Sequence, residues 1–447
     1  MSKDAIAGLD KFKAQQIINQ LKSGTTPLDA AHYIDVGRER WYRGMDYFLE
    51  AAAEGGSSQV RFIRGRYGDG KTHLMSMAMY YALKQGFVVS YASAENTPLN
   101  RFEELYKALA KSLQSELASG GLEHFLKDWK ERSKDDIGSL LSSLKTPGMD
   151  INFRLAIESF IKDDNYQHED RILQWLLGNP IKLPELGIKT SLTPTNSRDM
   201  MRSLSILVRL MGYSGLVVVL DELDRVQTQK SPVRQKVYQN LRQLLDNVDG
   251  QGGMQATVYY IAAPSEMYTQ NKGFLEYDAL RSRLEPAMKD LSQQKTFVDY
   301  RGVIINLEYT PMVEEDLVKM AKNVRDVHAI ALQWNAEENF PEETIRILVE
   351  HILREQYNIS TPRLVATTIA RVADIAEQKG KYDIIQEIEA SMRFAKRAGS
   401  SGTERSTRTE HGILPRESHS MQRYHQPIKI WGPTSRPCSS PTPERRL

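Results

Sequence analysis

Residues 65–72 read Gly-Arg-Tyr-Gly-Asp-Gly-Lys-Thr, and this motif indicates the class of fold. The spacing matches the pattern G-x-x-x-x-G-K-[ST], in which glycines allow a tight turn and successive backbone N–H groups face a phosphate. The residues before it predict a strand over 60–64, and those after it predict a helix over 71–85. A second strand over 87–91 completes a strand–loop–helix–strand unit, which is typical of a parallel sheet.

This loop predicts a binding site for ATP with magnesium. Lys71 would reach the β- and γ-phosphates, and the Thr72 hydroxyl would ligate Mg²⁺. The N-terminus of the following helix favours the negative charge of the phosphates. We expect the other nucleotide contacts of this region to come from Gly65, Tyr67, Gly68, Asp69, Gly70 and His73.

A second part of the site is predicted at the end of a buried strand. Residues 216–220 form an unbroken apolar run that leads into Asp221 and Glu222. Such a run fits a central parallel strand covered on both faces, and ligands bind outside the carboxyl ends of these strands. Asp221 is therefore expected to hold magnesium through water, and Glu222 to act as the base that orients the attacking water. The pattern assigns no role to Asp224.

Three residues further along the chain are additional candidates. Ser265 follows the strand predicted over 256–262, where its hydroxyl would either polarise the attacking water or cap the next helix. Arg283, and after it Arg281, are candidates for an arginine finger delivered from a neighbouring subunit to the γ-phosphate. Surface salt bridges are the alternative for both arginines.

The rest of the chain is predicted to be mostly helical. Two helical stretches over 11–30 and 39–53 precede the first strand, with a turn at 24–27, and a last strand is predicted over 302–308. A long insertion over about 100–212 is expected to contain helices at 101–118, 122–132, 151–162, 168–177 and 197–212. A helical lid domain is expected from helices at 313–333, 341–356, 362–378 and 382–398. The predicted domains are 1–56 (N-terminal helical segment), 57–310 (ATPase core), 311–398 (lid) and 399–447 (disordered tail).

Composition excludes several classes of protein. The chain is 40% apolar and 26% charged, and it contains no stretch of roughly 18 unbroken apolar residues that would cross a membrane. The first residues lack the apolar run of a signal peptide, which predicts a cytoplasmic protein. Cys438 is the one cysteine, so an internal disulfide framework and a cysteine-rich zinc site are both excluded.

The net charge of +2 hides an uneven distribution along the chain. Residues 393–447 carry 11 Lys/Arg and 4 Asp/Glu, so the remainder is mildly acidic and gives no compositional support for a large nucleic-acid footprint. Beyond about residue 399 the sequence is rich in Ser, Thr, Pro, Gly and Arg, which predicts disorder. This tail is either a basic arm for nucleic acid or a segment without a role.

Together these motifs resemble the AAA+ ATPases, and within them the origin-recognition and STAND-like branch. Residues 34–40, Ile-Asp-Val-Gly-Arg-Glu-Arg, are similar to the adenine-side motif of that branch. Residues 360–363, Ser-Thr-Pro-Arg, are similar to the segment that opens a lid helix with the sensor-2 arginine. The resemblance implies that Val36 and Gly37 border the adenine and that Arg363 touches the γ-phosphate.

A closer resemblance covers about residues 15–380 and is carried by the run over 18–91. This run is similar to bacterial ATP-binding proteins of phage-defence islands, including the BREX-associated ATP-binding protein BrxD. The resemblance implies an α/β P-loop NTPase of the AAA+ type, with a parallel sheet flanked by helices and a C-terminal helical lid. The long helical insertion departs from this pattern, because 148 residues separate Thr72 from Asp221, and it is expected to make partner contacts.

The same resemblance implies an ATPase that works beside other defence-operon proteins, often a helicase. Glu222 together with a candidate arginine finger motivates a homo-oligomer in which ATP between neighbouring subunits stabilises the assembly and hydrolysis resets it. Two alternatives remain: a nucleotide-gated scaffold with little turnover, and a helicase loader. A loader needs a DNA-binding element, and the C-terminal part shows no convincing winged helix. DNA binding stays an open question at this point.

Overall fold

The structure is a computed structural model that describes residue 6 and residues 8–163, 165–246, 253–293, 299–354 and 361–380. The helix expected over 382–398 and the tail with Cys438 lie outside the described residues.

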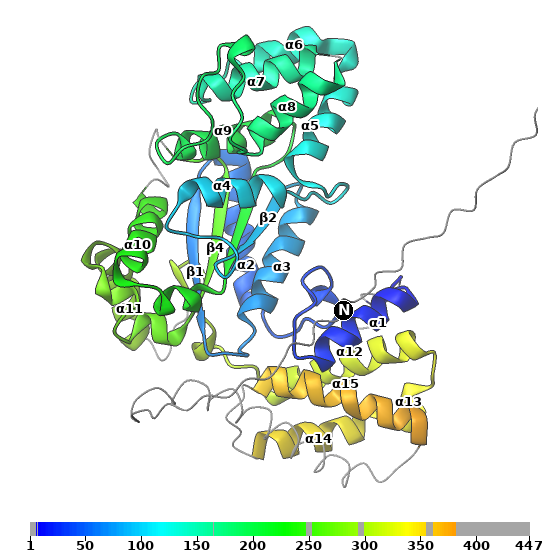
Figure 1. The fold of residues 1–447 in the computed structure, drawn as a ribbon. Helices are drawn as coiled ribbons and strands as arrows, with labels where there is room; N and C mark the ends of the chain where they lie inside the picture. Colours follow the sequence, from blue (N-terminus) through cyan, green and yellow to red (C-terminus); the bar gives the residue numbers. More distant parts are fainter. Residues whose placement is uncertain are drawn as a thin grey trace, which may run out of the picture. The chain divides into compact units, whose positions relative to one another are not determined.

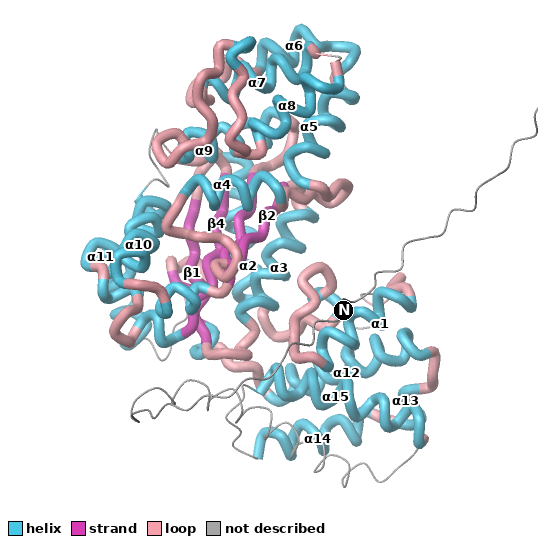
Figure 2. Tube along the Cα trace, in the orientation of Figure 1, coloured by secondary structure: helices cyan, strands magenta, loops and turns pink. Residues whose placement is uncertain are grey.

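Five strands form one parallel sheet at the centre of the fold (Figures 1 and 2). They are β1 (Gln59–Gly65), β2 (Val88–Ser93), β3 (Leu216–Asp221), β4 (Thr257–Pro264) and β5 (Ile304–Asn306). Their order is β2-β3-β4-β1-β5, and every neighbouring pair is parallel. The predicted class, an α/β fold with a parallel sheet flanked by helices, is confirmed.

Helices precede, cover and follow the sheet. Helices α1 (Lys11–Lys22) and α2 (Glu39–Gly55) precede β1, and α3 (Lys71–Lys84) follows it; α2 and α3 pack on one face of the sheet. The insertion contains α4 (Phe102–Lys111), α5 (Gly121–Arg132), α6 (Ile137–Ser143), α7 (Ile151–Lys162), α8 (Tyr166–Leu176) and α9 (Ser197–Leu210). The later helices are α10 (Ser231–Asp246), α11 (Asp278–Gln293), α12 (Glu314–Leu332), α13 (Ala336–Asn339), α14 (Glu342–Arg354) and α15 (Thr361–Lys379).

The buried apolar side chains form three clusters that explain this layering. On one face of the sheet, Val218 and Ile261 pack with the insertion helices and with α10 and α11. On the other face, Val217 and Val219 pack with α2 and α3. Because both faces are covered, every residue of β3 is buried, as its apolar run predicts.

The third cluster joins segments that are far apart in the sequence. Helix α1 packs against α12 and α15, and these helices share a core with α14. We call α1, α12, α14 and α15 the helical bundle. Side chains of α15 bind the end of α1, since Thr367 donates to the Leu21 carbonyl at 3.1 Å and Asp374 pairs with Lys22 at 2.5 Å. The N-terminal helix is therefore part of a bundle built mainly from the C-terminal half of the chain.

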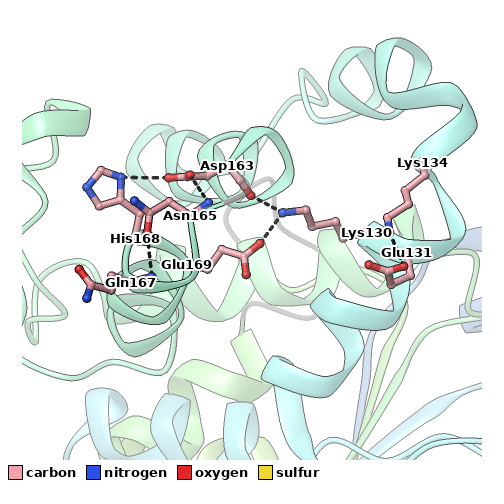
Figure 3. A network of polar contacts seen from close by, with 8 residues as sticks. All are labelled: Lys130, Glu131, Lys134, Asp163, Asn165, Gln167, His168 and Glu169. Atoms are coloured by element: carbon pink, nitrogen blue, oxygen red, sulfur yellow. Dashed lines mark hydrogen bonds and ion pairs between the residues drawn. The ribbon is translucent and has the colours of Figure 1, made fainter. Parts of the chain in front are cut away.

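A polar network fastens the helices of the insertion (Figure 3). The Lys130 ammonium of α5 donates to the Asp163 carbonyl after α7 and pairs with Glu169 of α8. The Asp163 carboxylate accepts the Asn165 N–H at 2.8 Å and contacts His168 at 3.0 Å, and these contacts lower its pKa. One lysine of α5 thus binds both the segment after α7 and helix α8.

Several predicted element boundaries were wrong, and tertiary contacts explain them. The helix predicted over 101–118 ends at Lys111, because Gln114 exchanges backbone hydrogen bonds with Val89 on the edge strand β2. The strand predicted over 302–308 is shorter, because the Asn306 side chain accepts the Glu308 N–H and starts a 3-10 turn. Helices α6, α10, α11 and α13 had no predicted counterpart.

None of the helices in the described part of the chain combines the length and the apolar character of a membrane-spanning segment.

Candidate nucleotide-binding site

The loop between β1 and α3 has the backbone shape that its glycines predict. Gly68 and Gly70 have φ of 92° and 93°, a left-handed region in which side chains with a Cβ are strained. Asp69 closes the turn, since its carboxylate accepts the Arg66 N–H at 2.6 Å. Gly70 directly precedes α3, so the orphan N–H groups of the first helical turn adjoin the loop. This combination is a phosphate-binding geometry.

Lys71 lies in the first turn of α3 and points back over the loop. Its ammonium donates to the carbonyls of Gly65 at 3.0 Å and Arg66 at 2.9 Å. An ammonium has three N–H groups, so these two contacts leave one for a phosphate oxygen. Burial lowers the pKa of Lys71, and the nearby carboxylates of Asp221 and Asp69 only partly oppose this effect. The lysine is therefore a desolvated cation beside the phosphate-binding loop.

Thr72 and Asp221 meet, although 148 residues separate them in the sequence. The Thr72 hydroxyl donates to Asp221 Oδ2 at 2.9 Å, and Asp221 Oδ1 accepts the Glu222 N–H at 2.7 Å. Burial raises the pKa of Asp221. A hydroxyl and a carboxylate beside a phosphate-binding loop are the oxygen ligands that Mg²⁺ prefers, so these residues fit the ion.

Glu222 follows Asp221 in a left-handed conformation, with φ 60° and ψ 37°. Its carboxylate accepts a hydrogen bond from the Ser93 hydroxyl at the end of β2. The register of the sheet explains this contact, because Ser93 pairs with Asp221 across β2 and β3. The sequence interpretation missed Ser93; the available signal was a hydroxyl at the end of a strand, but its partner depends on the strand order.

Ser265 follows β4, which lies between β1 and β3. Its hydroxyl donates to Glu308, and Arg64 Nε of β1 lies 4.0 Å from the same carboxylate. The 3-10 turn that begins at this residue has Pro264 at its N-cap, so Ser265 is not the capping residue. Glu308 thus lies between Ser265 after β4 and Arg64 of β1 and contacts both.

The segment that resembles an adenine-side motif lies against both the loop and the helical bundle. Val36 packs at the edge of the bundle core, and Gly37 has φ of 74°. His73, directly after the loop, contacts Asp35 through Nε2 at 2.8 Å. The structure also brings Arg363 of α15 to the loop, with its guanidinium 4.5 Å from the centre of the Tyr67 ring.

The two finger candidates lie on α11, which packs beside α10 (Figure 1). Arg283 pairs with Asp246 of α10 at 2.8 Å, and Arg281 pairs with Asp278 at 2.8 Å. Both arginines are more than 40% exposed, at 43% and 46% of the side chain. Among the described residues, their hydrogen bonds and ion pairs include none to the loop over 65–72.

A phosphate-binding loop after β1, with an acidic strand end bonded to its threonine, places the chain in the class of P-loop NTPase-like α/β proteins. Within that class, the chain belongs to the family described as BREX system ATP-binding protein BrxC/D, which matches residues 9–161 and 130–392. It is therefore an ATP-binding protein of a phage-defence system, and the predicted membership is confirmed. No curated protein and no solved structure matches the chain.

Proposed function

We propose that the chain hydrolyses ATP with magnesium. The observation that carries this proposal is the contact of the Thr72 hydroxyl with Asp221, with Glu222 next to it at the end of β3. A bound Mg²⁺ would neutralise charge that develops on the transferred phosphoryl group. The chain's own groups hold the phosphates through the loop N–H groups and Lys71, and Glu222 orients the attacking water.

Phosphate release tests this proposal directly. We would compare the wild type with Lys71→Ala, Glu222→Gln and the control Lys84→Ala, which removes an exposed lysine at the far end of the same helix. The two site variants should lose hydrolysis, and the control should keep it. Equal rates in the wild type and both site variants would refute the proposal. The assay should also be run with DNA and with other BREX proteins.

A nucleotide-gated scaffold is the second candidate, and the Ser93 contact favours it. Oε2 of Glu222 accepts a hydrogen bond from Ser93, which stabilises the carboxylate and makes it a weaker base, so turnover in the free protein would be slow. A partner that withdraws Ser93 would release the base. Capture of a BREX partner that survives Glu222→Gln but is lost in Lys71→Ala would support the scaffold; capture that requires turnover would exclude it.

The proposed assembly places ATP between subunits, with Arg283 or Arg281 reaching the γ-phosphate of a neighbour. Arg283 would have to leave Asp246 of its own chain, an exchange that costs little because surface ion pairs contribute about 0–1 kcal/mol. The mass of Glu222→Gln in solution, with and without ATP, tests this arrangement. A strict monomer with ATP bound would exclude both arginines as fingers in trans.

The remaining proposals concern partners and place in the cell. A helicase loader would bind DNA in a salt-sensitive manner, because phosphate contacts release counterions. Absence of such binding would leave the other BREX proteins, including a helicase, as the proposed partners. A cytoplasmic location follows from the same interpretation and can be tested by fractionating cells.

A further inference from the structure

Within the described residues, the chain crosses between the sheet and the helical bundle at two places. The first crossing is the segment over 23–38, which leads from α1 in the bundle to α2 on the sheet. The second is the segment over 307–313, which leads from β5 to α12. Any movement of the bundle relative to the sheet must pass through these two segments.

Arg38 binds the two crossings to each other and to the phosphate-binding loop. Its Nη1 donates to the Thr310 carbonyl at 2.6 Å and to the Thr310 hydroxyl at 3.3 Å. Its Nη2 donates to the Asp69 carbonyl at 3.1 Å. One planar guanidinium therefore contacts both Asp69 of the loop and Thr310 of the second crossing, which are 241 positions apart in the sequence.

The neighbours of Arg38 also contact the second crossing and the start of α12. The Trp41 indole donates to the same Thr310 hydroxyl at 3.0 Å. A Cβ placed on Gly37 would lie 2.6 Å from Asp316 Oδ2, in the first turn of α12. The segment before Arg38 thus touches the start of the bundle, and the segment after it touches the second crossing.

Arg38 is held in this position at an energetic cost. Its residue exposure is 6%, and burial lowers its pKa. Tyr42 and the carboxylates of Asp69 and Asp35 oppose that effect without cancelling it. A desolvated guanidinium keeps its geometry only while its carbonyl partners stay in place, because an unpaired buried charge is strongly unfavourable. A shift of the Asp69 peptide must therefore be followed by Thr310 or break a hydrogen bond.

We propose that Arg38 is a positioning residue that transmits nucleotide occupancy of the loop to the helical bundle. The proposal rests on nucleotide binding by residues 65–72 and does not require hydrolysis. Phosphates bound by the loop N–H groups move the Asp69 peptide, and Arg38 carries that movement to Thr310 and so to α12. Lysine cannot replace it, because the three N–H groups of an ammonium radiate from one nitrogen, whereas Arg38 uses two nitrogens of a rigid planar fork.

Distance measurements between two spin labels test the proposal in the full chain. Cys438→Ser removes the native thiol, and labels are placed on Phe12→Cys in the bundle and Leu117→Cys on the sheet side, which are 74% and 97% exposed. A non-hydrolysable ATP analogue with magnesium should shift the distance distribution of the otherwise wild-type protein. Arg38→Lys should bind the analogue but lose the shift.

Arg325→Lys is the matched control, because Arg325 is also buried, at 2% exposure, and donates to a carbonyl at 3.0 Å inside the bundle. It should keep the shift. Thr310→Ala tests the same link from the other side by removing the hydroxyl that Arg38 and Trp41 share, and it should reduce the shift.

Three results would overturn the proposal: an unchanged shift in both Arg38→Lys and Thr310→Ala, loss of the shift in Arg325→Lys as well, or no shift when the analogue is bound to the wild type. Failure of the proposed hydrolysis would appear in the phosphate assay alone and leave these distances unaffected.

Discussion

The left-handed backbone at Glu222 predicts a conflict between stability and activity at one residue. Glu222 has φ of 60°, where a residue with a Cβ is strained, while its carboxylate is the proposed base. Glu222→Ala and Glu222→Gly both remove the carboxylate and its hydrogen bond from Ser93. The difference between these two variants therefore isolates the backbone.

The size of that difference follows from two opposing terms. A left-handed conformation costs a residue with a Cβ roughly 1–2 kcal/mol. Glycine removes this cost but adds about 0.4–1 kcal/mol of conformational freedom in the unfolded chain. The glycine variant should therefore be the more stable by about 0.5–1 kcal/mol, which raises Tm by roughly 1–4 °C in a domain of this size.

Thermal unfolding measures the stability of the two variants, and phosphate release measures their hydrolysis. Both variants should lose about 10²–10⁴-fold in hydrolysis, the usual contribution of a general base. The control is Glu158 inside α7, where the order should reverse and Ala should be the more stable by about 0.5–1 kcal/mol. An alanine variant at 222 as stable as the glycine variant would refute the strain, and retained hydrolysis in both would refute the base.

Two further predictions concern the loop and its neighbours. Because burial raises the pKa of Asp221, its carboxylate takes up a proton at a higher pH than an ordinary aspartate; magnesium-dependent ATP binding should be complete above that raised pKa and lost as the pH falls through it. Asp221→Asn should lack this pH dependence in a fluorescent-nucleotide titration, and identical profiles would contradict the assignment. Tyr67→Ala removes the ring under Arg363 and should weaken ATP binding about 2–5-fold, from the ~0.5–1 kcal/mol of an exposed cation–π contact. Tyr67→Phe should bind like the wild type, and equal affinities for the two variants would contradict this role.

The parts of the fold that were predictable from the sequence are those governed by local rules. The glycines, lysine and threonine of residues 65–72 keep a fixed spacing, and they stand between a predicted strand and a predicted helix. The unbroken apolar run over 216–220 indicates a buried strand. A parallel sheet follows from that order of elements, and so does the meeting of Thr72 with Asp221 at the carboxyl ends of the strands.

The contacts that escaped prediction depend on non-local arrangement. Ser93 reaches Glu222 only because β2 lies beside β3, and strand order is not written in any single segment. Arg38 looks like an exposed residue at the start of a helix, yet its side chain is buried between Asp69 and Thr310. The packing of α1 with α12 was equally hidden, because the periodicity of α1 shows an apolar face without showing what covers it.

The burial of charge at this site explains why it should favour its ligands together. Burial disfavours the charged form of Lys71 and, independently, that of Asp221. A phosphate supplies negative charge that stabilises the ammonium, and Mg²⁺ supplies positive charge that stabilises the carboxylate. ATP without metal would bring several negative charges next to Asp221, and metal without ATP would approach Lys71 unscreened. The two should therefore bind cooperatively, and the strength of that coupling depends on keeping water away from both side chains.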